Sequence, residues 1–171
     1  FCVTRCRSNI NTKGAPRWLR LRWALAVKRE ILMRIGSENE NIEFGDLSEP
    51  YESSPYGFQF RIKVALNIQD FHGFYDCIYV DESEVKHFIK SLKALDKSRQ
   101  GAAKICSVNP DELLFEIRSI DSLGHMEVGI QLHRYYYGDQ CHRPVYLMGT
   151  FEIDPGAVAQ LISFFRKLGR R

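Results

Sequence analysis

The densest group of chemically competent side chains lies between His133 and Pro144. This segment, His-Arg-Tyr-Tyr-Tyr-Gly-Asp-Gln-Cys-His-Arg-Pro, holds two His, one Cys and one Asp. Cys and His are zinc ligands, but a structural zinc site needs four of them, commonly as two close pairs. Adjacent Cys141 and His142 make a poor chelating pair, and no second pair follows. The sequence therefore predicts no metal site, and we expect no cofactor.

The same segment could supply a nucleophile, Cys141, with His125 or His133 as its base. The flanking residues match no cysteine-enzyme pattern, and any chain with five His offers such pairs by chance. We therefore expect no catalytic residues and no enzyme. Two alternatives stay open: a hydrolase that uses Cys141 and His133, and a small-molecule pocket around His125, His133 and Tyr135.

Our preferred interpretation of this segment is an exposed loop that binds a protein partner. Tyr and Arg are enriched at the centres of protein interfaces. The alternative is a strand on which the Tyr residues alternate, with one ring turned inward. The candidate interface residues are Arg134, Tyr135, Tyr136, Tyr137, Asp139 and Arg143.

A second candidate is the acidic and aromatic stretch Asp70–Asp76, Asp-Phe-His-Gly-Phe-Tyr-Asp. We expect a bend here, which could meet a cationic partner. Alternatively, Phe71 and Phe74 anchor the bend to the core.

Charge divides the chain at Met33. Residues 1–32 hold eight of the 24 Lys and Arg residues and one of the 21 acids, so residues 33–171 hold 16 basic and 20 acidic residues. Nucleic acids are bound through basic surfaces, so we expect no nucleic-acid binding by residues 33–171. We expect residues 1–32 to be an upstream mistranslated segment. The alternative is a basic arm whose Trp, Leu and Arg residues bind a membrane surface.

The remaining composition favours a soluble, cytoplasmic protein. Arg20 and Arg22 interrupt the apolar run that a secretory signal needs, and no run approaches the roughly 20 apolar residues of a membrane span. Five Cys are too few and too scattered for a disulfide framework. We expect Cys77 and Cys106 to be buried in the core.

Apolar periodicity predicts the secondary structure of residues 33–171, which we take as a single domain. A helix begins near Asp81 or Ser83, with Asp81 and Glu84 as a capping box, and a second opens at Asp154-Pro155-Gly156. The predicted strands span 42–44, 58–68, 77–80, 103–108, 113–120, 126–135 and 145–153. The predicted fold is α+β: an antiparallel sheet of about five to seven strands with both helices packed on one face.

Several motifs, taken in order, resemble the WapI-like group of small bacterial proteins. They are the helix Asp81-Glu-Ser-Glu-Val-Lys-His-Phe, then Leu114-Phe-Glu-Ile-Arg, Gly124-His-Met-Glu-Val-Gly-Ile and Phe151-Glu-Ile-Asp-Pro-Gly. The resemblance covers roughly residues 58–168. It implies an immunity protein that neutralises a partner toxin in bacteria without catalysing a reaction, and it brings no catalytic residues. An acidic inhibitor would also be steered toward a basic toxin.

Overall fold

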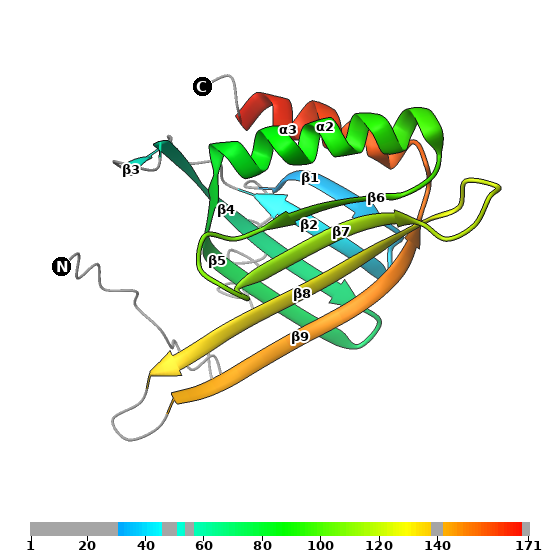
Figure 1. Ribbon diagram of the computed structural model, residues 1–171. Helices are drawn as coiled ribbons and strands as arrows, with labels where there is room; N and C mark the ends of the chain where they lie inside the picture. Colours follow the sequence, from blue (N-terminus) through cyan, green and yellow to red (C-terminus); the bar gives the residue numbers. More distant parts are fainter. Residues whose placement is uncertain (1–30, 46–50, 54–56, 138–141, 169–171) are drawn as a thin grey trace. The chain divides into compact units, whose positions relative to one another are not determined.

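The computed structural model describes residues 31–45, 51–53, 57–137 and 142–168, which form nine strands and two helices (Figure 1). The helices are α2 (Glu82–Ser98) and α3 (Ala157–Leu168). The strands are β1 (Ile31–Gly36), β2 (Glu40–Gly45), β3 (Tyr51–Ser53), β4 (Gly57–Ile68), β5 (Phe71–Asp81), β6 (Ala102–Cys106), β7 (Leu113–Ser119), β8 (Met126–Tyr137) and β9 (His142–Ile153).

The strands form two antiparallel sheets, so the prediction of one sheet is wrong, whereas the α+β class is confirmed. In the first sheet β1, β2, β4 and β5 are neighbours in that order, and short β3 pairs with the start of β4. The second sheet runs β6-β7-β8-β9 in chain order. A meander followed by a helix thus occurs twice. Each meander has one apolar face. Such a face can be covered by the apolar face of a second sheet or by a helix.

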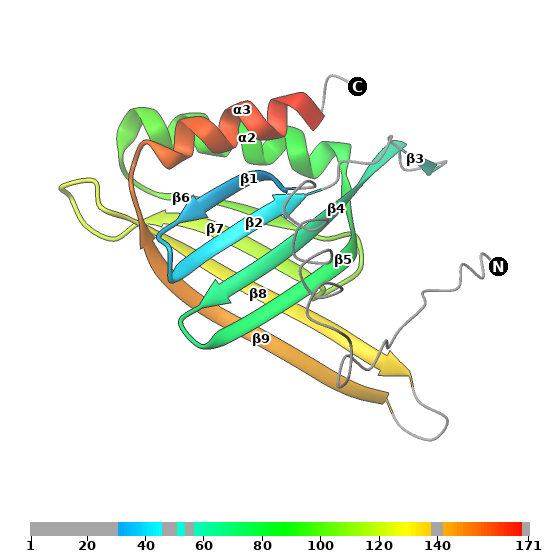
Figure 2. The same cartoon turned by 180° about the vertical axis from the view of Figure 1, so that it is seen from behind.

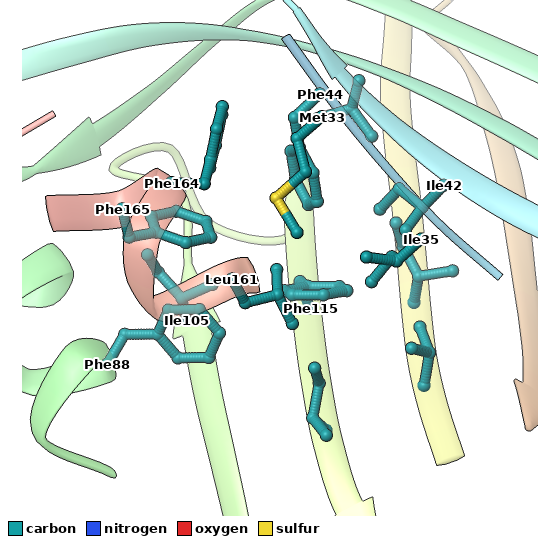
Figure 3. Close-up of a cluster of buried hydrophobic side chains, with 14 of the residues drawn as sticks. Met33, Ile35, Ile42, Phe44, Phe88, Ile105, Phe115, Leu161, Phe164 and Phe165 are labelled. Carbon is teal, nitrogen blue, oxygen red and sulfur yellow. The ribbon is translucent and has the colours of Figure 1, made fainter. Parts of the chain in front are cut away.

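Phenylalanine rings join the two sheets and both helices in one core (Figure 3). Phe115 of β7 lies edge-on to Phe44 of β2, with ring centroids 5.3 Å apart, and to Phe88 of α2 at 5.9 Å. Phe165 of α3 completes the circle, 5.0 Å from Phe88 and 5.8 Å from Phe44. Helix packing on one face of a single sheet is therefore not confirmed, because helical rings contact residues of both sheets. Figures 1 and 2 show α2 and α3 side by side across one end of the sheets.

The β4–β5 hairpin crosses β9 at two glycines. A β-carbon on Gly73 would overlap the Leu147 side chain, and one on Gly149 would overlap Ile68. Both positions need glycine because strand and side chain approach too closely for any larger residue. This crossing brings the start of β5 against the second sheet, where the candidate site lies.

Most predicted elements are confirmed, with differences at their ends. β4 and α2 have the predicted alternation and buried face, and Asp154 Oδ1 accepts the Gly156 N–H at 2.6 Å where α3 opens. The capping box at Asp81 is wrong: Asp81 is the N-cap residue but makes no side-chain cap hydrogen bond, and as the last residue of β5 it pairs with Gln59.

Two segments expected as a bend and a loop are largely strand. Phe71 already begins β5, and β8 continues to Tyr137 before β9 starts at His142. The sequence also gave no prediction of β1 or β3. Cys77 and Cys106, the two cysteines among the described residues, are half-buried and not core. Cys77 falls in the irregularity of the β4–β5 ladder, and Cys106 follows inward-facing Ile105, so it points to the other face of β6.

Candidate functional site

The two sequence candidates, Asp70–Asp76 and His133–Pro144, meet in the structure. An open pocket of about 240 Å³ lies between them. From β5 come His72, Gly73, Phe74 and Tyr75; from β8, Leu132, His133 and Arg134; from β9, Val145 and Leu147. We call this the β5–β8–β9 pocket. Its lining joins four aromatic or imidazole rings, a guanidinium and aliphatic side chains, a mixture suited to contact with a protein or a small organic molecule.

Arg134 is the cation of this pocket, and residues of β5 hold its guanidinium. The Arg134 Cζ atom lies 5.0 Å from the centroid of the Tyr75 ring, and Nη1 lies 3.7 Å from Asp76 Oδ1. A partly exposed cation–π contact contributes about 0.5–1 kcal/mol, and an exposed ion pair about as much or less. These contacts orient Arg134 across the gap between the sheets.

Tyr75 is fixed by Glu112, which precedes β7. The Tyr75 hydroxyl donates to Glu112 Oε1 at 2.8 Å. Burial raises the pKa of the Tyr75 phenol well above its ordinary value, and the hydrogen bond to the Glu112 carboxylate raises it further. The phenol therefore stays protonated at neutral pH, which makes Tyr75 a hydrogen-bond donor and not a base or nucleophile.

His72 is oriented by a chain of amides. Asn41, which is buried, donates its Nδ2 to the carbonyls of Ser37 and Glu38, and its Oδ1 accepts Asn67 Nδ2 at 2.8 Å. Asn67 Oδ1 is then left to accept from His72 Nδ1, also at 2.8 Å. Because Nδ1 carries the proton, Nε2 of neutral His72 is an acceptor. His72 can thus accept a hydrogen bond at the pocket from a partner's N–H or O–H group.

His133 lies beside the pocket in a stacked pair. Its ring is buried and parallel to Tyr146, with centroids 4.0 Å apart and planes at 15°, and its backbone N–H donates to the Glu112 carbonyl. Cys141 lies outside the described residues, so its pairing with His133 stays a prediction. Of the pocket expected around His125, His133 and Tyr135, the β5–β8–β9 pocket includes His133 and not His125, which precedes β8; the Tyr135 side chain lies outside the described part.

The exposed aromatic side chain of this region is one that the sequence left undecided. Phe71 is 69% and Phe74 55% exposed, so neither ring anchors a bend to the core; Val145, in the same pocket lining as Phe74, is 52% exposed. Phe74 and Tyr75 are aromatic neighbours on β5 and point to opposite faces. Alternation alone does not show which of the two faces outward; in the structure it is Phe74. We call Phe74, Arg134 and Val145 the pocket rim.

Of the six predicted interface residues, the structure describes the side chain of Arg134 alone. Asp139 and the side chains of Tyr135, Tyr136, Tyr137 and Arg143 lie outside the described part. The backbone register is described: Tyr135 pairs with Pro144, Tyr136 with Arg143, and Tyr137 with His142. These positions continue β8 and β9 directly beyond Arg134 and Val145 of the pocket rim, which are themselves paired.

Comparison of the chain with family models, curated proteins and solved structures found no match in any of the three. The resemblance to the WapI-like group therefore stays a prediction.

Within the described ranges, no three His, Cys, Asp or Glu side chains gather in a way that could hold a metal ion. Of the helices that the structure describes, neither is long and apolar enough to cross a membrane.

A separate ionisable pair, Asp121 and His125, closes the β7–β8 hairpin. Asp121 Oδ1 accepts the backbone N–H groups of Leu123, Gly124 and His125, and Oδ2 lies 2.5 Å from His125 Nδ1. The hydrogen bond and charge of Asp121 raise the pKa of His125 above its ordinary 6.5, with a smaller contribution from Glu152. The hydrogen bond to His125 likewise lowers the pKa of Asp121.

We expect this pair to stabilise the hairpin in a definite pH window. The raised His125 pKa gives a contribution that is full below the unfolded value and is lost as pH rises through the folded pKa. The lowered Asp121 pKa gives a contribution that is lost as pH falls through its folded value. NMR titration should find His125 above 6.5, and Asp121→Asn should bring it down further than Glu152→Gln does. Asp70→Asn, in another hairpin, is the control; an unchanged His125 pKa in Asp121→Asn would refute the assignment.

Proposed function

We propose that this domain is a non-catalytic protein-binding module, and that it acts as an immunity protein that neutralises a partner toxin in bacteria. The observation that carries the proposal is the pocket rim: an exposed Phe, an oriented Arg and an exposed Val, contributed by both sheets. Exposed apolar side chains grouped around Arg and bordered by polar residues are typical of protein interaction sites.

The dimensions of the pocket also favour a protein partner over a small ligand. Pockets that hold a small molecule commonly enclose about 300–1,000 Å³ and bury most of the ligand. The β5–β8–β9 pocket has about 240 Å³ and an exposed rim. A single side chain of a partner fits such a volume, with His72 and Arg134 in the pocket lining to hold it.

The toxin as partner follows from the resemblance, and the charge of residues 33–171 supports it, although the full chain with residues 1–32 has a net charge of +3. Residues 33–171 hold 16 basic and 20 acidic residues. An acidic surface accelerates association with a basic protein through complementary charge, and toxins that attack nucleic acid carry basic surfaces. Contacts with the pocket rim would then hold the toxin in the position in which its activity is blocked.

Recovery of the tagged full chain from its own organism, followed by native mass spectrometry, tests the proposal. A stoichiometric second protein that arrests growth when expressed alone, and not when this chain is co-expressed, is the expected result. A bound small mass with no protein partner would instead favour the second candidate, a small-molecule-binding domain that uses His72, Arg134 and Tyr75 as convergent polar groups. A partner whose toxicity is unaffected by co-expression would contradict the immunity role.

The predicted interface residues beyond the rim give a separate prediction. We expect Tyr136→Ala and Arg143→Ala, at paired positions of β8 and β9, to weaken partner binding by about tenfold or more, as interface Tyr and Arg commonly do. The free energy of unfolding should change by less than about 0.5 kcal/mol, the usual limit for surface positions. Binding is measured by calorimetry and stability by urea titration. A loss of several kcal/mol in stability would place these side chains in the core.

A further inference from the structure

β9 leaves one of its two edges without a described partner. It is the last strand of the second sheet, and within the described ranges it pairs with β8 alone, from Met126 and Ile153 to Tyr137 and His142. An exposed edge of twelve residues presents a row of backbone N–H and C=O groups that can accept another strand, except at Pro144, which has no N–H.

The edge of β9 also lacks the charges that protect the other edges. Each of the other edge strands carries a charge: Arg34 in β1, Asp76 in β5 and Lys104 in β6, which is only five residues long. The edge of β5 is also covered in part, because the Val108 N–H donates to the Tyr79 carbonyl at 2.8 Å. From Pro144 to Phe151, β9 has eight residues without a charge. Edge strands of monomeric proteins commonly carry a charge, above all Lys, that prevents pairing with another chain.

Exposed apolar side chains accompany this uncharged edge. Tyr146 is 54% and Met148 65% exposed, on the face of β9 opposite to Val145 and Leu147 of the pocket. Phe71, which pairs with Ile68 at the tip of the β4–β5 hairpin, is 69% exposed, and Ile68 lies against Gly149 of β9. Two large apolar side chains, Tyr146 and Met148, therefore lie exposed on one face of this edge strand, outside the pocket rim, and exposed Phe71 belongs to the hairpin that crosses β9.

We propose that β9 pairs in antiparallel orientation with β9 of a second copy of this chain, which joins two four-stranded sheets into one of eight strands. Residues directly opposite each other in an antiparallel pair have their side chains on the same face of the sheet. The two-fold axis of the dimer must therefore lie between a residue and the same residue of the second copy. With Leu147 opposite the partner's Leu147, Tyr146 lies opposite the partner's Met148, and Val145 opposite the partner's Gly149, against which Ile68 of that copy lies. A sulfur beside an aromatic ring is a favourable contact.

Charge selects a second copy over an unrelated strand. The register centred on Leu147 sets the acid of β9, Glu152, opposite the partner's His142, and Arg143 opposite the partner's Phe151. No like charges face each other at either end of this register. The eight uncharged residues between Arg143 and Glu152 offer no opposite charge to a partner strand that is itself charged. A self-complementary edge is what a closed two-fold dimer needs.

The dimer is independent of the proposed partner binding and compatible with it. The two β8–β9 hairpin ends point in opposite directions when β9 pairs in antiparallel orientation, so each copy keeps its own pocket rim. The inference goes beyond the proposed function and is tested without any toxin.

Sedimentation equilibrium of the full chain over a hundredfold range of concentration tests the proposal. The expected mass rises from one chain to two and stops there, and β9 amides become slower in hydrogen exchange as concentration increases. Met148→Lys, or Thr150→Lys on the same face, should weaken dimerisation at least tenfold. Leu123→Lys, on an 83% exposed residue of the β7–β8 hairpin, should leave it unchanged.

Three results would overturn the proposal. They are a mass of one chain at every concentration, a dimer that neither lysine variant of β9 weakens, and β9 amides whose protection is independent of concentration. The last result would mean that another segment of the same chain covers this edge. Far-ultraviolet circular dichroism of each variant establishes that it is folded before its mass is interpreted.

Discussion

Phe115→Ala is expected to destabilise the domain by about 3–5 kcal/mol, the range for truncation of a buried Phe. Phe115 has no exposed surface, and its ring lies edge-on to Phe44 of the first sheet and Phe88 of α2. The change removes apolar contacts and leaves a cavity where both sheets meet a helix. Urea denaturation should show the loss directly, and the melting temperature should fall by roughly 10 °C or more.

Two further variants give this prediction its controls. Phe71→Ala removes the same atoms from an exposed position and should cost less than about 0.5 kcal/mol. A double-mutant cycle of Phe44 and Phe115 should yield a coupling of about 0.5–1.5 kcal/mol, the contribution of an aromatic pair. If Phe115→Ala cost less than 1 kcal/mol, the ring would not link the sheets as described.

Phe74→Ala is expected to weaken partner binding by about 30-fold or more, corresponding to the 2 kcal/mol or more of an interface hot spot. Phe74 is exposed at the pocket rim and lines the same pocket as Arg134, whose guanidinium Tyr75 and Asp76 hold. A partner side chain that enters the pocket would lose its apolar contact with the ring, whereas the folded domain alone would lose little.

Phe58→Ala is the matched control, because Phe58 is 44% exposed near the start of β4, away from the hairpin tip. Affinity for the purified partner, measured by calorimetry, should change less than twofold in this variant. Equal losses in Phe58→Ala and Phe74→Ala, or none in Phe74→Ala, would remove the pocket rim from the interface.

Local patterns predicted most of the helices and strands of the fold, but not how they pack together. Alternation from Phe58 to Ile68 predicted β4, and Val85, Phe88, Leu92 and Leu95 predicted the buried face of α2. The pairing of these elements into two sheets was not predictable. An apolar face on a strand shows that something covers it, and it does not show whether the cover is a helix or another sheet.

The candidate site shows the same division. The sequence singled out Asp70–Asp76 and His133–Pro144 separately, from residue types known at interfaces. Their meeting depends on Gly73 and Gly149, where the absence of a β-carbon lets the β4–β5 hairpin cross β9. Nothing in the spacing of His72 and Arg134, 62 positions apart, predicts that they line one pocket.

The sequence by itself thus determined the class of structure, the positions of both helices and of most strands, the hairpin turn at Asp121 and the two segments rich in interface residues. These depend on interactions between residues close in the chain, which a local pattern records. Only the tertiary structure decided that the sheets are two, that Phe74 is exposed and Tyr75 buried, that Arg134 lies over Tyr75, and that β9 pairs with β8 alone within the described ranges. Each of these depends on which distant surfaces pack together, and that choice is made by the fit of whole faces and not by any single segment.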